Sequence, residues 1–129
     1  MIGNGSNLLC ADEGVRGMVI NIGGKMNGIS NEDTIVSAQA GSRLSALAAY
    51  AAKRGLGGLE FAGGIPGNLG GALYMNAGAY GGEMKNVVKT VTYLEDGEIY
   101  TKSIDELDFG YRKTYFTGKQ CVILSCTIE

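Results

Sequence analysis

Two glycine-rich segments hold the residues with the clearest chemical potential. The first is "GNGSNLL", Gly3 to Leu9, and the second is "GGIPGNLGGALYMNAGAYGG", Gly63 to Gly82, which contains the chain's only proline. Glycine adopts backbone conformations that turn successive N–H groups into one concavity, and such a nest attracts phosphate oxygens without a basic side chain. A helix starting near Asn68 would add its unpaired N–H groups and its dipole. Both loops are therefore candidates for binding a diphosphate.

A purely structural role for these glycines stays open. Glycines also mark tight turns and close packing, and neither common nucleotide fingerprint is met. Leu8 stands where a dinucleotide motif beginning at Gly3 would need its third glycine, and no Gly-Lys pair is followed by Ser or Thr as a Walker A loop requires. From the residues alone, nucleotide binding and packing are about equally favoured.

Composition argues against several other functions. The 129 residues suit one domain, and 11 basic against 13 acidic side chains give a formal charge of -2, which does not favour nucleic acid or an anionic membrane surface as partner. The chain has no histidine, so it has no His-based triad and no imidazole metal ligand. Cys10, Cys121 and Cys126 lack the paired spacing of a zinc or redox site, and we predict no metal. We expect Cys121 and Cys126 to be small buried hydrophobes.

The sequence also carries no export or membrane signal that we recognise. No basic and then apolar leader follows Met1, and the apolar runs are shorter than the roughly 20 residues that a bilayer span needs. We therefore expect a soluble, cytoplasmic protein.

The first half of the chain predicts two strands and a helix around the loops. Alternating apolar residues predict a strand over Val15 to Gly24 and a second over Asp33 to Gly41. The apolar spacing after Ser42 predicts a helix over Arg43 to Arg54, with Ser42 as its N-cap. A short buried helix is expected to open near Asn68.

The second half predicts mostly antiparallel strands. Asp96-Gly97 is a strong hairpin signal between Val87 to Leu94 and Glu98 to Ser103. "SIDE", Ser103 to Glu106, fits a capping box and predicts one helical turn, and "CVILSCTIE" predicts a final strand. Strands combined with one long helix favour the α+β class. Because the chain begins at a glycine loop and stops at a strand, we interpret both ends as cut.

Three segments together resemble a known family. "GNGSNLL", "AGSRLSALAAYAAKRGLGGLEFAGGIPGNLGGALYMNAGAYGGE" and "ELDFGYRKTYF" occur in the order found in the UDP-N-acetylenolpyruvoylglucosamine reductases of bacterial peptidoglycan synthesis, and the resemblance covers essentially the whole chain. It implies an α+β FAD-binding domain of the vanillyl-alcohol-oxidase (PCMH) type, truncated at both ends. Residues 1–28 would be a remnant of the first FAD-binding lobe and residues 29–129 the second lobe, with the substrate-binding domain absent.

The resemblance also implies which residues hold the cofactor. In this family the two loops bind the FAD diphosphate through backbone N–H groups. The matching positions here are Gly3, Asn4, Gly5, Ser6 and Asn7 in the first loop, and Gly64, Ile65, Pro66, Gly67, Asn68, Gly70 and Gly71 in the second. Asn68 stands where the family often has Ser or Thr, and all three residue types can cap a helix.

Arg112 matches the family's active-site arginine and Tyr111 a tyrosine of the same motif. The family reaction uses NADPH and FAD to reduce the enolpyruvyl group of a UDP-sugar, and a planar guanidinium suits the substrate carboxylate. The serine that donates the proton lies outside the matched segments. We therefore expect the chain alone to lack full turnover, and we expect self-association through uncovered strand edges. The alternative function is a non-catalytic nucleotide-binding or assembly module.

Overall fold

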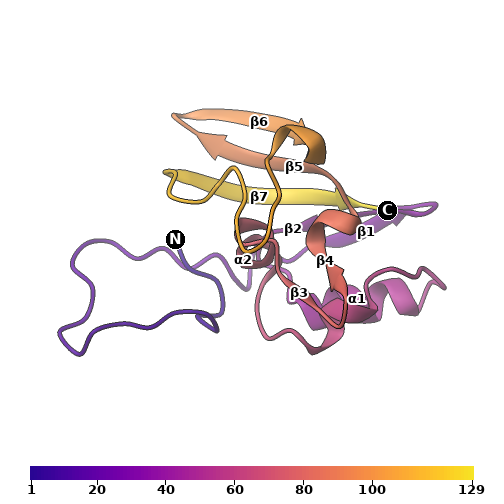
Figure 1. Cartoon of the computed structure of the whole chain (residues 1–129), viewed down its shortest axis with the longest axis horizontal. Coiled ribbons are helices and arrows are strands. Elements are labelled where there is room, and N and C mark those ends of the chain that lie inside the picture. The colour runs from indigo at the N-terminus through magenta and orange to yellow at the C-terminus, as the bar shows by residue number, and fades with distance from the viewer.

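The computed structural model describes all 129 residues and is built on a five-stranded antiparallel sheet (Figure 1). The strand order is β1-β2-β7-β5-β6, so the strand nearest the C-terminus lies in the centre. The strands are β1 (Ile29–Glu32), β2 (Ile35–Gln39), β5 (Val88–Glu95), β6 (Glu98–Ser103) and β7 (Cys121–Ile128). β7 pairs with β2 on one side and β5 on the other, which joins the two halves of the chain in one sheet.

The helices lie together on one side of this sheet (Figure 1). They are α1 (Leu44–Ala52) and α2 (Leu69–Tyr74). The 3-10 turns are η1 (Glu60–Gly64), η2 (Met84–Asn86) and η3 (Ile104–Glu106), and η3 lies apart from the helices, directly after β6. A separate two-stranded ribbon, β3 (Gly78–Ala79) with β4 (Gly82–Glu83), follows α2. None of the helices is both long and apolar enough to span a bilayer.

The core fills the space between the sheet and the helices. Alternate residues of each strand face inward because successive strand side chains point to opposite faces, whereas the helices bury residues three or four apart. The fully buried large side chains include Leu44 and Leu47 of α1, Leu69 and Leu73 of α2, Val91 and Tyr93 of β5, and Phe116. Each such apolar side chain contributes about 1.5–3 kcal/mol when it leaves water. The first residues of both helices, Leu44 and Leu69, belong to this core.

Most elements expected from the sequence are confirmed. The hairpin forms with its turn at Asp96 and Gly97, both with positive φ, and the capping box is present in η3. The strand before Gly41, the helix after Ser42, the short helix opening after Asn68 and the final strand all form within one or two residues of the expected ends. Strand β1 was not predicted. The expected burial is confirmed for Cys126 but not for Cys121, which is only partly buried at the start of β7.

Two local predictions are wrong. Val15 to Gly24 forms no strand, because it meets no partner strand and most of its apolar side chains, such as Met18 at 87 % exposure, are exposed; only Ile22 packs against the core. Only an isolated bridge joins Ile2 to Asn21. Ser42 does not cap α1, since Arg43 occupies the N-cap position and makes no side-chain cap bond. The Ser42 hydroxyl is instead buried without a partner.

The first 28 residues form an extended loop that runs out from the sheet and returns to it (Figure 1). Its start is held by the bond from the Ile2 amide to the Ile20 carbonyl, at 2.9 Å. The start of the loop, residues 2–7, therefore lies beside its returning part and beside the main body of the domain.

Candidate functional site

The two glycine-rich loops meet in space although about 60 residues separate them. The Ser6 hydroxyl donates a hydrogen bond to the Pro66 carbonyl at 2.6 Å, and the Asn7 side-chain amide lies 3.3 Å from the Met75 sulfur. Gly3 packs against Asn68 so closely that a Cβ at Gly3 would lie 2.9 Å from the Asn68 Oδ1. Glycine at position 3 is thus required by this contact and not by a turn.

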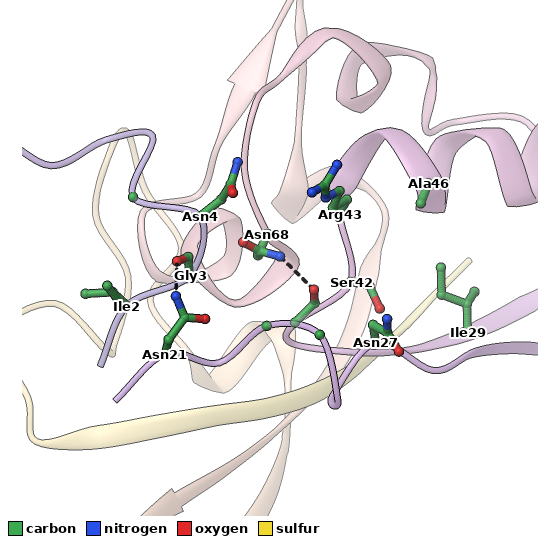
Figure 2. Close-up of a pocket in the computed structure, with 14 residues that line it drawn as sticks. Ile2, Gly3, Asn4, Asn21, Asn27, Ile29, Ser42, Arg43, Ala46 and Asn68 are labelled. Carbon is green, nitrogen blue, oxygen red and sulfur yellow. Dashed lines mark hydrogen bonds between the residues drawn. The ribbon is translucent and has the colours of Figure 1, made fainter. Parts of the chain in front are cut away.

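A cavity of about 540 Å³ opens where the loops meet (Figure 2). Its walls come from the first loop, from the connection before β1, from the connection between β2 and α1, and from the start of α2. The lining residues are Ile2, Gly3, Asn4, Gly5, Asn21, Gly23, Gly24, Asn27, Ile29, Gly41, Ser42, Arg43, Ala46 and Asn68. Four asparagines and five glycines give the cavity a largely polar lining.

Several backbone N–H groups at this site are free to bind a ligand. None of the amides from Gly3 to Asn7 donates a hydrogen bond within the chain, and neither do the amides of Gly67 and Asn68. The first loop can expose them because Gly5 has φ +69°, a conformation that disfavours other residues. Unpaired amides at converging loops form a site suited to anions such as phosphate.

The start of α2 contributes fewer free amides than the sequence suggested. The Leu69 amide donates to the Ser42 carbonyl and the Gly70 amide to the Ala40 carbonyl, each at 2.8 Å. Gly70 itself is needed for packing, because a Cβ there would lie 3.1 Å from the Ala40 Cβ. Two amides at the start of α2 are therefore already bonded to the connection between β2 and α1.

Asn68 has a structural bond in place of the expected cap. Its Nδ2 donates to the Gly41 carbonyl at 2.6 Å, while its backbone occupies the N-cap position of α2 (Figure 2). This bond ties the second loop to the turn between β2 and α1. The residue is 9 % exposed and borders the cavity, so it positions one wall.

The structure divides the predicted cofactor residues into two groups. Gly3, Asn4, Gly5 and Asn68 line the cavity. The others do not border it. Ser6, Asn7, Pro66 and Gly67 form the contact between the loops just described, Gly70 packs on Ala40 after β2, and Gly64, Ile65 and Gly71 lie away from the lining.

Arg112 and Tyr111 lie at the apex of a separate tight turn. Reciprocal bonds between Gly110 and Lys113 close this turn, and Arg112 has a positive φ of 54°. The Arg112 guanidinium carbon lies 5.9 Å from the centre of the Tyr111 ring, which is 89 % exposed. Neither residue lines the cavity, so the structure does not bring them together with the diphosphate loops.

A buried asparagine holds this turn in place. The Asn76 Nδ2 donates to the Gly110 carbonyl at 3.0 Å and to the Glu83 carboxylate at 2.9 Å, and its Oδ1 accepts from the Lys85 amide at 3.0 Å. The Thr114 hydroxyl adds a bond to the Tyr74 carbonyl at the end of α2. Helix α2 thus connects the loop contact at its start with the Arg112 turn beyond its end.

Sequence reasoning missed several cavity residues. Asn21, Gly23, Gly24 and Asn27 come from a segment that was assigned in part to a strand, and Ser42 was assigned to capping. Arg43 was treated only as the first residue of a helix. The available signal was that Arg43 stands at a helix start, where a positive side chain is unfavourable unless an anion compensates it.

Comparison with known proteins gives three consistent matches. The family model described as "FAD binding domain" matches residues 1–103. A UDP-N-acetylenolpyruvoylglucosamine reductase of Clostridioides difficile is 48 % identical over 130 residues, covering 100 % of this chain and 43 % of the relative. One from Agathobacter rectalis is also 48 % identical, over 97 % of this chain and 44 % of the relative.

A solved structure agrees with these relatives. The crystal structure of UDP-N-acetylenolpyruvylglucosamine reductase (MurB) from Thermus caldophilus superposes with a TM-score of 0.86 at 38 % identity. The match covers 98 % of this chain and 46 % of that one. The chain therefore spans less than half the length of these two relatives and of this solved reductase.

Proposed function

Because this chain belongs to the FAD-binding domain family and is similar along its whole length to UDP-N-acetylenolpyruvoylglucosamine reductases, we propose that it is the flavin-binding part of such a reductase. The predicted α+β class and FAD-binding fold are confirmed by the family match and by the likeness to a solved reductase.

One observation carries the proposal: the two loops of the sequence motif converge on one polar cavity and present unpaired amides there. A diphosphate needs many hydrogen-bond donors, and backbone N–H groups supply them without extra side chains. The residues present therefore fit the FAD diphosphate. In this assignment Gly3, Asn4 and Gly5 bind it directly from the first loop.

The second loop has both a binding and a supporting role. Asn68 borders the cavity and would bind through its free amide, and Gly67 would support the loop just before it. Ser6 and Pro66 hold the two loops at the spacing the diphosphate needs, and Asn7 does so through Met75. Gly64, Ile65, Gly70 and Gly71 would shape the loop and its close approach to the sheet. When bound, the flavin would supply hydride transfer, which no side chain of this chain can perform.

We propose that Arg112 contacts the substrate. Its exposed guanidinium on the Gly110–Lys113 turn can pair with a carboxylate in two parallel hydrogen bonds and stabilise charge that develops there. Tyr111 would border the same substrate. We propose that the substrate is the enolpyruvyl ether of a UDP-sugar, that NADPH is the reductant, and that the enzyme works in the cytoplasm in peptidoglycan synthesis.

We further propose that residues 1–28 belong to the first FAD-binding lobe and residues 29–129 to the second, since the sheet begins at Ile29. These 129 residues by themselves would not complete turnover, because a positioned general acid contributes about 10²–10⁴-fold and none is assigned here. NADPH oxidation by this chain at the rate of a full-length relative would contradict this.

Self-association of the isolated chain is part of the same proposal. Strands β1 and β6 are the edges of the sheet, and the side chains of Leu9 and Met18 are 101 % and 87 % exposed in the first segment. Unpaired edges and exposed apolar side chains favour pairing with a second copy. Sedimentation equilibrium should then show dimers or larger species, and a strict monomer would refute the idea.

Flavin titration tests the main proposal. The purified chain should bind FAD, seen as a flavin absorption spectrum that is retained after gel filtration and as a change in flavin fluorescence. The Gly3→Ala variant should bind more weakly, because its new methyl group would collide with Asn68. Gly63→Ala is the matched control, since its methyl group would lie 3.8 Å from the Ala48 Cβ, which is ordinary contact.

Two outcomes would count against the proposal. A wild-type chain that is folded but binds no FAD at any accessible concentration would favour the non-catalytic module as its function. Equal binding by wild type, Gly3→Ala and Gly63→Ala would show that flavin binds elsewhere.

A further inference from the structure

The cavity between the loops contains a single charged side chain. Three of its 14 lining residues are hydrophobic, and the remainder are glycines, asparagines, Ser42 and Arg43. No aspartate or glutamate lines it. Arg43 is therefore the only source of full charge in a site whose other polar groups are neutral, and that charge is positive.

The Arg43 guanidinium has no partner within the chain. It takes part in none of the three salt bridges, in no side-chain hydrogen bond and in no cation–π contact. Arg54, near the other end of α1, is different: its guanidinium stacks 3.5 Å above the Tyr50 ring. Figure 2 shows the Arg43 side chain at the start of α1, on the side of the cavity where Asn4 lies.

The place of Arg43 on α1 is unfavourable without a ligand. It is the N-cap of a nine-residue helix whose first turn contains no acidic residue. Helix N-termini carry a partial positive charge, so a cation there is repelled and an anion is attracted. The Arg43 amide also donates no hydrogen bond within the chain. The dipole, the amide and the guanidinium therefore all favour the same kind of ligand.

Ser42 gives independent support for a ligand at this wall. It is 1 % exposed and lines the cavity, yet its hydroxyl has no hydrogen-bond partner in the chain. Figure 2 shows its side chain in the wall between Arg43 and Asn27. Buried hydroxyl groups are nearly always paired, so a ligand that brings an acceptor to this wall would satisfy it.

We propose that Arg43 binds a phosphate group in this cavity, with the Ser42 hydroxyl as a second donor from the same turn. The inference rests on the proposed function, and it adds the cation that the glycine loops lack. The ligand class is a nucleoside diphosphate, and the Arg43 guanidinium bonds to its phosphate oxygens. The amides of Asn4 and Gly5, in the first glycine loop, approach the same phosphates.

The expected size of the effect follows from the kind of bond. Charge-assisted hydrogen bonds are stronger than neutral ones, but Arg43 is exposed on one side, so solvent weakens its share. We expect removal of the charge to reduce affinity about tenfold. Loss of a neutral donor, as in Ser42→Ala, should reduce affinity by about threefold.

Binding to three ligands by the 129-residue chain tests the inference. ADP carries a diphosphate without a flavin, riboflavin carries the flavin ring without phosphate, and FAD carries both. Arg43→Gln should weaken FAD and ADP binding about tenfold and leave riboflavin binding unchanged. The difference from wild type should shrink in high salt, because an exposed ion pair is screened.

Arg54→Gln is the matched control, since it makes the same change in net charge beyond the other end of α1. It should leave all three affinities unchanged, and circular dichroism should show that every variant is folded. Ser42→Ala should lose affinity for ADP without losing stability, because it removes a hydroxyl that had no partner.

The possible results separate the two proposals. If wild type binds FAD and Arg43→Gln binds it equally well, the inference about Arg43 is wrong and the proposed function stands. If Arg43→Gln and Arg54→Gln weaken binding equally, the effect comes from net charge and the inference is also wrong. If wild type binds neither FAD nor ADP, both proposals fail.

Discussion

Substitution of Asn76 gives the most direct test of how the turn carrying Arg112 is held. The side chain is 3 % exposed and makes three hydrogen bonds, to Glu83, to the Gly110 carbonyl and from the Lys85 amide. Asn76→Ala removes all three bonds and leaves their partners in a partly buried region. We therefore expect both the stability of the domain and the order of the turn to fall.

The magnitude can be worked out from these contacts. Losing three bonds at about 1 kcal/mol each gives roughly 3 kcal/mol. Asn76 also has a φ of +47°, which asparagine tolerates better than alanine, and this adds about 1 kcal/mol. The expected loss in the free energy of unfolding is therefore about 4 kcal/mol, a large part of the roughly 5–15 kcal/mol of a typical domain.

The chain offers a matched control in Asn31. Its side chain is exposed, donates to the Asp33 carbonyl at 3.1 Å and accepts from the Tyr50 hydroxyl at 3.0 Å. Because water can replace both bonds, Asn31→Ala should cost less than about 1 kcal/mol. Urea unfolding followed by circular dichroism measures both variants against wild type.

A second measurement addresses the turn itself. Amide hydrogen exchange at Lys113 reports the bond from its amide to the Gly110 carbonyl, and Asn76→Ala should speed that exchange under native conditions. If Asn76→Ala and Asn31→Ala destabilise the chain equally, or if exchange at Lys113 is unchanged, then Asn76 does not hold the turn and the reasoning is refuted.

Three further predictions follow from packing and ionisation. Gly82→Ala should destabilise the domain by about 1–3 kcal/mol in urea unfolding, because a Cβ there would lie 2.7 Å from a ring carbon of the buried Phe61. Two hydrogen bonds to the Glu106 carboxylate lower its pKa: the larger effect comes from the Ser103 amide and the smaller from the Ser103 hydroxyl. Ser103→Ala removes only the hydroxyl bond, so an NMR titration should show the pKa of Glu106 rising but staying below its ordinary value. Burial raises the pKa of the Cys126 thiol from its ordinary 9.0 to about 12, so its contribution to stability is complete below pH 9 and is lost as the pH rises towards 12. Urea midpoints measured from neutral pH to above pH 9 should fall more steeply for wild type than for Cys126→Ala, and parallel curves would refute this.

Local chemistry in the sequence determined much of the framework. Asp96-Gly97 forms a hairpin because both residues accept positive φ, and Ser103 with Glu106 forms a capping box because both partners lie within one turn. The apolar spacing after Ser42 likewise sufficed for α1. In each case the decisive interactions join residues only a few positions apart, so the sequence contains them directly. The order of motifs also sufficed to predict the family match.

The failed strand shows where local patterns stop. Val15 to Gly24 has the alternation of a strand, yet a strand needs a neighbour to accept its hydrogen bonds and a layer to cover its apolar face. Beside this segment there is only the single bridge between Ile2 and Asn21, and only Ile22 packs against the core. The alternation of apolar residues is present, but whether such a segment becomes a strand depends on neighbouring strands that a short stretch of sequence does not contain.

Only the tertiary structure decided how the site is assembled. The loop at Gly3 meets Asn68, and the Asn76 side chain reaches Gly110, across separations of 65 and 34 residues. Arg43 was visible as a helix start, but its place in the wall of the cavity depends on that helix packing beside the returning first loop. Such contacts form because packing of the core aligns the sheet and the helices. The hydrophobic effect is not directional, so the residues next to one another in sequence do not show which distant segments will meet. The sequence thus determined which groups were available, and packing decided which of them face one another.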